Sequence, residues 1–192
     1  FKAIVPYYIS HIYFVQEKYE HLIAFAKPLS EKVLSSRSSE LNRLLAESYY
    51  RINDFENAAK YFEKFIINEK KVSSTVYFLL GYSYFRLLDY DNTIYNLKNV
   101  VDAVDSVKQY AYYYLGASYL HLEYYNYALN AFKKSASYDH DINLKEEAFY
   151  NYAKLSYQLD LPFDNTLQLL KTYLEKFNNT NYTEDIKILL AK

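Results

Sequence analysis

Two stretches of the chain read almost alike: YFLLGYSYFRLLDYDNTIYNL at residues 77–97 and YYYLGASYLHLEYYNYALNAF at residues 112–132. Each contains one of the only two glycines of the chain, and Gly81 and Gly116 lie 35 residues apart. A fixed period of about 20 to 50 residues is the sequence signature of repeat architectures. The match therefore predicts that one structural unit recurs along the chain.

The phrase recurs across the whole sequence when it is aligned on the position of the two glycines. Three residues after that position stands a tyrosine in four phrases out of five, and an aromatic residue follows near the ninth. Apolar residues within each phrase step by three or four, which is the spacing of a helix. The aligned small residues are Ser10, Ala46, Gly81, Gly116 and Ala153. We expect two helices per repeat, in repeats at about 3–37, 39–73, 74–108, 109–144 and 146–180, with 181–192 starting a further or capping helix.

The composition narrows the class of protein. With 51% hydrophobic and 23% charged residues, the 192-residue chain can bury a core, and its 2 Gly and 3 Pro are too few for a protein of many short strands. The net charge of −1 provides no basic field for nucleic acid. The absence of cysteine excludes disulfides and thiolate metal sites. No apolar run has the length of a membrane span, about 18 residues.

The sequence lacks the residue patterns of a catalytic or cofactor site. Both glycines belong to the repeat, so no glycine-rich loop remains to hold a phosphate. The four histidines fall at unrelated repeat positions, which does not favour a metal site. Adjacent carboxylates such as Glu146 and Glu147 diverge on a helix. We expect no enzymatic activity, no metal and no cofactor.

Several polar residues and prolines mark where helices begin or bend. Asp54, after Asn53, and Asp89 are expected to cap the second helices of their repeats. Asn143 and Glu146 have the spacing of a capping box. Two prolines add local signals. Pro162 suits the first turn of a helix, and Pro28 should shorten or kink the helix that contains it.

These residues resemble tetratricopeptide repeats, whose pattern combines Leu-Gly or Leu-Ala with a tyrosine, a turn aromatic, an alanine and a phenylalanine. One repeat matches through Leu45, Ala46, Tyr49, Phe55, Ala58 and Phe62, and another through Tyr112, Leu115, Gly116, Tyr119, Tyr125, Ala128 and Phe132. The resemblance spans almost the whole chain and implies an all-α fold, a right-handed α-solenoid of antiparallel helix pairs. The chain is also similar in texture to tetratricopeptide proteins of the bacterial cell envelope.

The first helix of each pair should line the concave side of such a solenoid. One of its faces is expected to pack in the core, through Leu45, Tyr77, Leu80, Tyr84, Tyr112, Leu115, Tyr119, Phe149 and Tyr152. Its other face would form a groove rich in aromatic and basic residues. The candidate binding residues there are Tyr7, Phe14, Arg43, Tyr50, Arg51, Phe78, Tyr82, Phe85, Arg86, Tyr113, His121, Tyr150, Lys154 and Tyr157.

Exposed aromatic patches with arginine generally mark interaction sites. The sequence therefore favours a scaffold that binds a peptide or partner protein in this groove. Three alternatives stay open: the rings pack between neighbouring helices, the tyrosines bind a glycan, or the block is a spacer or dimerisation module. A subgroup of the family grips chaperone tails through paired Lys and Asn; the corresponding positions here, such as Arg43 and Glu47 or Phe78 and Tyr82, lack that pair.

The sequence also suggests expectations about the precursor, the localisation and the oligomeric state of the protein. It starts FKAIVPYYIS, without Met or the layout of a signal peptide, so we interpret it as a piece of a longer precursor. The resemblance to envelope proteins favours the periplasm or cell envelope, with the cytoplasm as the alternative. A homodimer is possible because the terminal repeats lack polar caps.

Overall fold

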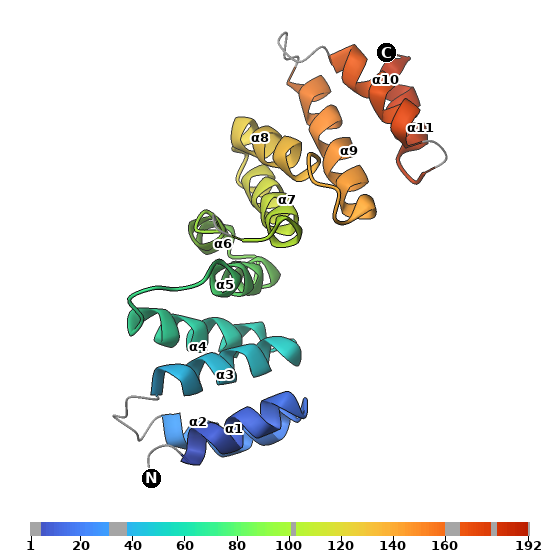
Figure 1. The fold of residues 1–192 in the computed structure, drawn as a ribbon. Helices are drawn as coiled ribbons and strands as arrows, with labels where there is room; N and C mark the ends of the chain where they lie inside the picture. The colour runs from blue at the N-terminus through green and yellow to red at the C-terminus, as the bar shows by residue number, and fades with distance from the viewer. Residues whose placement is uncertain (1–4, 31–37, 101–102, 160–165, 178–179, 192) are drawn as a thin grey trace. The chain divides into compact units, whose positions relative to one another are not determined.

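A computed structural model describes residues 5–30, 38–100, 103–159, 166–177 and 180–191 of the chain. Within these residues the structure contains eleven helices and no strand (Figure 1). The predicted all-α fold of helix pairs is therefore confirmed. The chain divides into two compact units, Phe1–Asn99 and Val100–Lys192. The predicted single continuous block stays a prediction.

The helices of each unit follow one another in pairs along the chain. The first unit contains α1 (Val5–Val15), α2 (Tyr19–Ser30), α3 (Ser38–Arg51), α4 (Phe55–Ile67), α5 (Ser74–Arg86) and α6 (Tyr90–Leu97). The second contains α7 (Asp105–His121), α8 (Tyr125–Ser135), α9 (Ile142–Gln158), α10 (Thr166–Lys176) and α11 (Thr183–Leu190). Helices α7 and α9 begin a few residues before the predicted starts of the fourth and fifth repeats.

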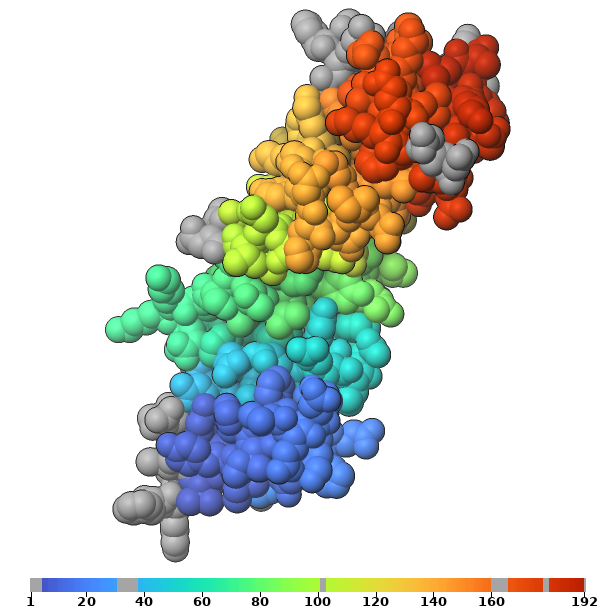
Figure 2. Space-filling view, turned by 45° about the vertical axis from the view of Figure 1, so that its right-hand side comes forward, coloured from blue at the N-terminus to red at the C-terminus, as the bar shows by residue number. Residues whose placement is uncertain are grey.

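The first helices of successive pairs contact one another inside each unit. In the first unit α3 contacts both α1 and α5, while α2 packs on α3 and α4 packs on α5. In the second unit α9 contacts α7 and α11, while α8 packs on α9 and α10 on α11. In the space-filling view (Figure 2), colours within each unit follow one another in chain order, as expected for stacked pairs. The row α1, α3 and α5 is called here the inner row of the first unit.

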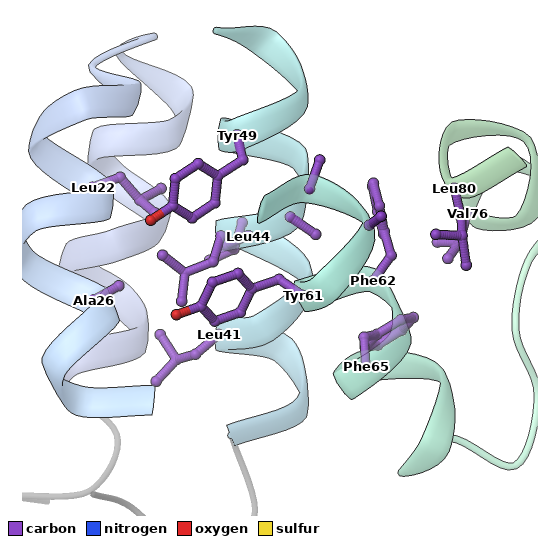
Figure 3. Close-up of a cluster of buried hydrophobic side chains, with 14 residues drawn as sticks. Leu22, Ala26, Leu41, Leu44, Tyr49, Tyr61, Phe62, Phe65, Val76 and Leu80 are labelled. Atoms are coloured by element: carbon purple, nitrogen blue, oxygen red, sulfur yellow. The ribbon is translucent and has the colours of Figure 1, made fainter. Parts of the chain in front are cut away.

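Aromatic and aliphatic side chains fill the core of the first unit (Figure 3). The Tyr49 and Tyr61 rings stack with their centroids 5.5 Å apart where α3 and α4 meet α2. On the other side of α4, Phe62 faces Val76 and Leu80 of α5. The buried faces of consecutive helices thus make one continuous apolar layer within this unit.

Most of the predicted core residues lie in the interior. Leu45, Leu80, Leu115, Tyr119 and Tyr152 are buried, while Tyr77, Tyr84, Tyr112 and Phe149 are partly buried. Tyrosines keep a polar end that must reach water or a partner. The Tyr84 hydroxyl, for instance, donates a hydrogen bond to Glu63 of α4.

The two glycines lie where the helices of a pair approach most closely. A Cβ atom at Gly81 would lie 2.6 Å from Leu97 Cδ2, and one at Gly116 would lie 2.7 Å from Phe132 Cδ1. Both distances are too short for real carbon contacts. The 35-residue spacing therefore reflects the same close approach of α5 to α6 and of α7 to α8.

Four turns inside the helix pairs share one backbone conformation. Glu17, Asn53, Leu88 and Glu123 have φ values of 58°, 62°, 61° and 61°. In the second turn Asp54 N donates to Tyr49 O (2.9 Å) and Asn53 N to Tyr50 O (3.1 Å). The other three turns repeat both bonds, which define the Schellman end of a helix. The sequence did not show this motif because none of the four residues is glycine.

The predicted helix starts are partly confirmed. Asp54 accepts a hydrogen bond from Asn57 N (3.2 Å), and Asp89 accepts one from Asn92 N (3.1 Å). The capping box was wrong: Asp141 is the N-cap of α9, its side chain accepts from Leu144 N (3.0 Å), and Asn143 lies inside the helix. Two further predictions concern prolines. Pro28 lies within α2, whereas Pro162 falls outside the described residues.

Candidate binding site

Rings from three helices converge on the inner row of the first unit. The Tyr82 ring of α5 lies 5.8 Å from the Tyr50 ring of α3 and 5.9 Å from the Phe55 ring at the start of α4. It also stacks on Phe78 one turn earlier, at 6.3 Å. Together with Arg86, these residues are called here the Tyr82 cluster. Four of the predicted binding residues, Tyr50, Phe78, Tyr82 and Arg86, are thus brought together.

Arg86 lies across the open side of the Tyr82 cluster. Its Cζ is 4.5 Å from the centroid of Phe55, the distance of a cation–π contact. One guanidinium nitrogen donates to the Tyr82 hydroxyl (3.2 Å). The side chain is nevertheless exposed. A guanidinium has five N–H donors, so this contact orients Arg86 while leaving donors directed to solvent.

The Tyr50 side chain is partly buried within the cluster. Burial, followed by the neighbouring Tyr82, raises the pKa of Tyr50 to about 12, although the positive charges of Arg51 and Arg86 act in the opposite direction. Tyr50 therefore stays neutral at physiological pH. The cluster offers neutral ring surface bordered by cationic groups, since Arg51 is exposed at the end of α3.

The other predicted residues of the first unit lie around this cluster or further along the row. Arg43 forms an ion pair with Glu47 one turn later (2.6 Å), so its charge is partly neutralised. Phe85 lies beside Tyr90 with ring centroids 6.0 Å apart. Tyr7 and Phe14 of α1 are partly buried and pack against the core.

In the second unit, the predicted tyrosines tie neighbouring helices together. Tyr113 of α7 donates a hydrogen bond to Glu147 of α9. Burial and then this hydrogen bond raise the pKa of the Tyr113 hydroxyl. Tyr150 of α9 donates to Asp185 Oδ2 of α11 (2.9 Å). Both side chains therefore connect consecutive first helices.

Tyr150 differs most from the expectation of an open groove. It is only 6% exposed, and its ring stacks on Tyr182 with centroids 4.2 Å apart. The physical reason is α11, which covers this part of α9. Lys154 donates to the Tyr150 hydroxyl (3.0 Å), and Tyr157 packs on the same buried cluster. His121 is exposed at the end of α7.

Sequence reasoning missed two kinds of residue at these surfaces. Phe55 was recognised as the aromatic residue of the turn, but its place in the Tyr82 cluster depends on contacts with α5. Glu147 and Asp185, the acceptors for Tyr113 and Tyr150, lie 34 and 35 residues away from them. That separation is one repeat, so a search for tyrosine and acid one period apart would have found both pairs.

The described residues contain neither a metal-binding cluster nor a membrane-spanning helix. Among the described residues, no three His, Cys, Asp or Glu side chains are arranged to hold a metal ion. In the same residues, every helix is too short or too polar to cross a membrane.

Comparison with known proteins identifies the repeat. Residues 44–69 match the family model described as tetratricopeptide repeat. A search of curated protein sequences finds no match.

Several solved structures are similar over most of the chain. YrrB, described as a TPR protein with an unusual peptide-binding site, is 17% identical with a TM-score of 0.74, and the match covers 97% of this chain and 96% of that one. MamA is 21% identical over 90% of both chains, with a TM-score of 0.68. The C-terminal part of a TPR repeat-containing protein from Cytophaga hutchinsonii is 17% identical over 93% of this chain and 71% of that one, with a TM-score of 0.64. The chain therefore has the tetratricopeptide-repeat fold that its sequence predicts.

Proposed function

We propose that this chain is a non-catalytic scaffold that holds a peptide or a helix of a partner protein against the Tyr82 cluster. The observation that carries the proposal is the convergence of rings from α3, α4 and α5 beneath an exposed arginine. Tyrosine and arginine are enriched at binding hot spots because they combine large contact area with polar groups. The cluster thus has the composition of an interface centre.

The geometry favours the first unit over the second as the binding surface. In the second unit the hydroxyls of Tyr113 and Tyr150 already donate to carboxylates of the next helix. In the first unit, Arg51 and Arg86 are exposed next to partly buried rings. A partner with apolar side chains and a carboxylate would satisfy both features. The peptide-binding site named for YrrB supports the view that this fold can hold a peptide.

Charge reversal at the exposed arginine tests the proposal. We expect Arg86→Glu to abolish capture of the partner, because it replaces a donor by an acceptor over Phe55 and Tyr82. Lys60→Glu is the matched control, since Lys60 is an exposed cation on the neighbouring α4. A photo-reactive residue placed at exposed position 87, next to Arg86, or at exposed position 56, one turn before Lys60 on α4, keeps both tested side chains and would identify what lies against each surface.

Thermal melting of each variant shows whether it still folds, and crosslinking shows whether it still captures the partner. Unchanged melting of Arg86→Glu with loss of one specific crosslinked protein supports the proposal. The proposal is wrong if that protein is captured equally by Arg86→Glu and by Lys60→Glu, or if the crosslinks from the two positions are the same.

A further inference from the structure

A pocket of about 360 Å³ lies between α4 and α6 in the first unit. Helix α5 forms its floor, with a different face from the one that carries the Tyr82 cluster: Tyr77 and Leu80 line the pocket, whereas Phe78 and Tyr82 belong to the cluster. Figure 1 shows the three helices as neighbours in one unit. All three helices lie within the described residues. The proposed partner surface does not use this pocket.

The walls of the pocket suit a short aliphatic chain. Leu80 at the base is only 2% exposed, while Ile67 and Tyr95 at the rim are 81% and 71% exposed. Ile66 and Tyr77 complete the apolar wall. Large apolar side chains this exposed gain free energy when a ligand covers them.

The polar groups of the pocket are mainly side-chain amides held in place by hydrogen bonds. Asn92 and Asn96 of α6, and Asn99 just after it, donate through Nδ2 to nearby oxygens: Asn92 to Asp89 Oδ2 (2.8 Å), Asn96 to Asn92 O (2.8 Å) and Asn99 to Tyr95 O (2.9 Å). These bonds orient each amide group, which keeps its carbonyl oxygen as an acceptor and a second N–H as a donor.

Among the described residues that line the pocket, the one charged side chain is a carboxylate, and none is lysine or arginine. Glu63 of α4 accepts a hydrogen bond from the Tyr84 hydroxyl, which leaves it further acceptor capacity. The neighbouring Lys64 is directed elsewhere, because its Nζ lies 4.7 Å from the centre of the Tyr61 ring.

The C-terminal ends of two helices also favour a positively charged ligand in the pocket. Helix α4 ends at Ile67 and α6 ends at Leu97, so the last turns of both helices adjoin the pocket. A helix C-terminus carries a partial negative charge that attracts cations. The positive end of α5 opposes this effect, but its first turn is capped by Ser73, which accepts from Val76 N. Two negative helix ends therefore adjoin the pocket, and each is partly capped, because Asn68 Nδ2 donates to Lys64 O (2.8 Å) and Asn99 Nδ2 to Tyr95 O (2.9 Å).

We propose that this pocket binds an alkylammonium group, namely the side chain of a lysine presented by a partner protein. The four methylene groups would lie along Ile66, Ile67 and Leu80. The ammonium would donate to Glu63 and to the amide oxygens of α6, with the Tyr95 ring available for a cation–π contact. This second site is independent of the Tyr82 cluster and would let the scaffold contact partners on two faces of α5.

The direct test is a nuclear magnetic resonance titration of the ¹⁵N-labelled chain with N-acetyl-lysine methylamide. We expect saturable shifts at the amides of Ile67, Asn96 and Asn99 with the lysine derivative, and none at equal concentration with its Nε-acetylated form, which lacks the charge. Glu63→Gln should weaken binding by about three- to tenfold, since it removes one charge-assisted hydrogen bond near the surface. Glu56→Gln is the matched control, because Glu56 is exposed on α4 outside the pocket.

Each other outcome overturns the proposal. Equal shifts with norleucine and lysine derivatives would mean that the pocket recognises apolar chains without regard to charge. Shifts with simple sugars but not with lysine would assign the amides to hydroxyl groups of a glycan. Absence of shifts at the highest soluble concentration would mean that no ligand of this class binds. A second variant, Tyr95→Ala, keeps the test informative if Glu63→Gln fails to fold, because Tyr95 is exposed and its loss should also weaken lysine binding.

Discussion

The contact between Gly116 and Phe132 sets how closely α7 and α8 can approach. We expect Gly116→Ala to lower the free energy of unfolding by about 1 to 2 kcal/mol, because overpacking outweighs the better helix propensity of alanine. Three atoms of the rigid Phe132 ring lie within 2.9 Å of the position that the new Cβ would occupy. Chemical denaturation, with the midpoint and slope measured together, checks this value.

Gly81→Ala is the natural comparison at the same place in its repeat. The atoms that its Cβ would meet first belong to Leu97, whose branched side chain can rotate. We expect a smaller loss of stability than for Gly116→Ala. A larger loss at Gly81 would mean that the flexibility of the opposing side chain does not control the cost.

At the turn residues with positive φ, we expect glycine to stabilise the chain rather than to be needed for close packing. Leu88 has a φ of 61°, and a side chain in that region costs about 1 to 2 kcal/mol. Leu88→Gly should therefore raise stability by about 0.5 to 1 kcal/mol, after the greater freedom of glycine in the unfolded chain is subtracted. Leu87→Gly should lower stability instead, because Leu87 has an ordinary φ of −88°. Thermal melting of both variants checks this: the melting temperature should rise for Leu88→Gly and fall for Leu87→Gly. A lower melting temperature for Leu88→Gly contradicts the prediction.

At the scale of elements, local sequence signals predicted what depends on local contacts. The helix pairs and the caps at Asp54 and Asp89 followed from residues a few positions apart. The start of α9 was misplaced because Asp141 and Asn143 are both good capping residues, and only the packed structure selects Asp141. The burial of Tyr150 depends on α11, which lies one repeat further along the chain.

Bonds between tyrosines and carboxylates connect the helices of the second unit and make its stability sensitive to alkali. They join Tyr110 to Asp141, Tyr113 to Glu147, Tyr150 to Asp185 and Tyr173 to Glu146. Burial is the largest cause that raises the pKa of Tyr113 and of Tyr173 above the usual 10.0. The unfolded chain therefore loses these protons first. The stability contributed by the neutral hydroxyls is complete below pH 10 and is lost as the pH rises towards the folded-state pKa.

Tyr113→Phe tests this pH dependence. At neutral pH we expect a loss of about 1 kcal/mol for the missing hydrogen bond. Between about pH 9 and pH 11 the variant should lose less stability than the natural chain, because one shifted hydroxyl has been removed. Tyr95→Phe, which alters an exposed ring, is the control for the removal of a tyrosine hydroxyl and should cost less stability at neutral pH than Tyr113→Phe. Parallel curves for Tyr113→Phe and the natural chain would show that Tyr113 does not contribute to the alkaline loss.

For the whole molecule, the question is whether a substitution that destabilises one unit also destabilises the other. Repeat proteins are stabilised mainly by contacts between neighbours. Leu45→Ala should cost about 2 to 4 kcal/mol and raise amide hydrogen exchange in α2, α3 and α4, because Leu45 is fully buried among them. We expect α9, α10 and α11 to keep their protection. Leu170→Ala is the reciprocal control, since it lies in the buried cluster of the second unit. Equal loss of protection in both units would show that the chain unfolds as one cooperative body.

The period of the sequence was sufficient to predict the helix pairs that the described residues form, but only part of the candidate site. It identified which helix faces carry Tyr50, Tyr82 and Arg86, because face follows from helical spacing. The period could not distinguish exposed tyrosines from tyrosines whose hydroxyls are hydrogen-bonded to a neighbouring helix. That difference depends on Asp and Glu residues in the next repeat. Phe78 and Tyr150 lie at equivalent places in their repeats, and Tyr150 is buried because α11 follows in the same unit.

The tyrosine bonds also give the chain an optical reporter. It has 26 tyrosines and no tryptophan, so its intrinsic ultraviolet fluorescence comes from tyrosine alone. A hydroxyl that donates to a carboxylate emits weakly, and emission should return when the bond opens. The second unit contains such bonds from Tyr110, Tyr113, Tyr150 and Tyr173, and the first unit contains the bond from Tyr84 to Glu63. The opening of these bonds can thus be followed by an increase in tyrosine fluorescence, without attaching any label.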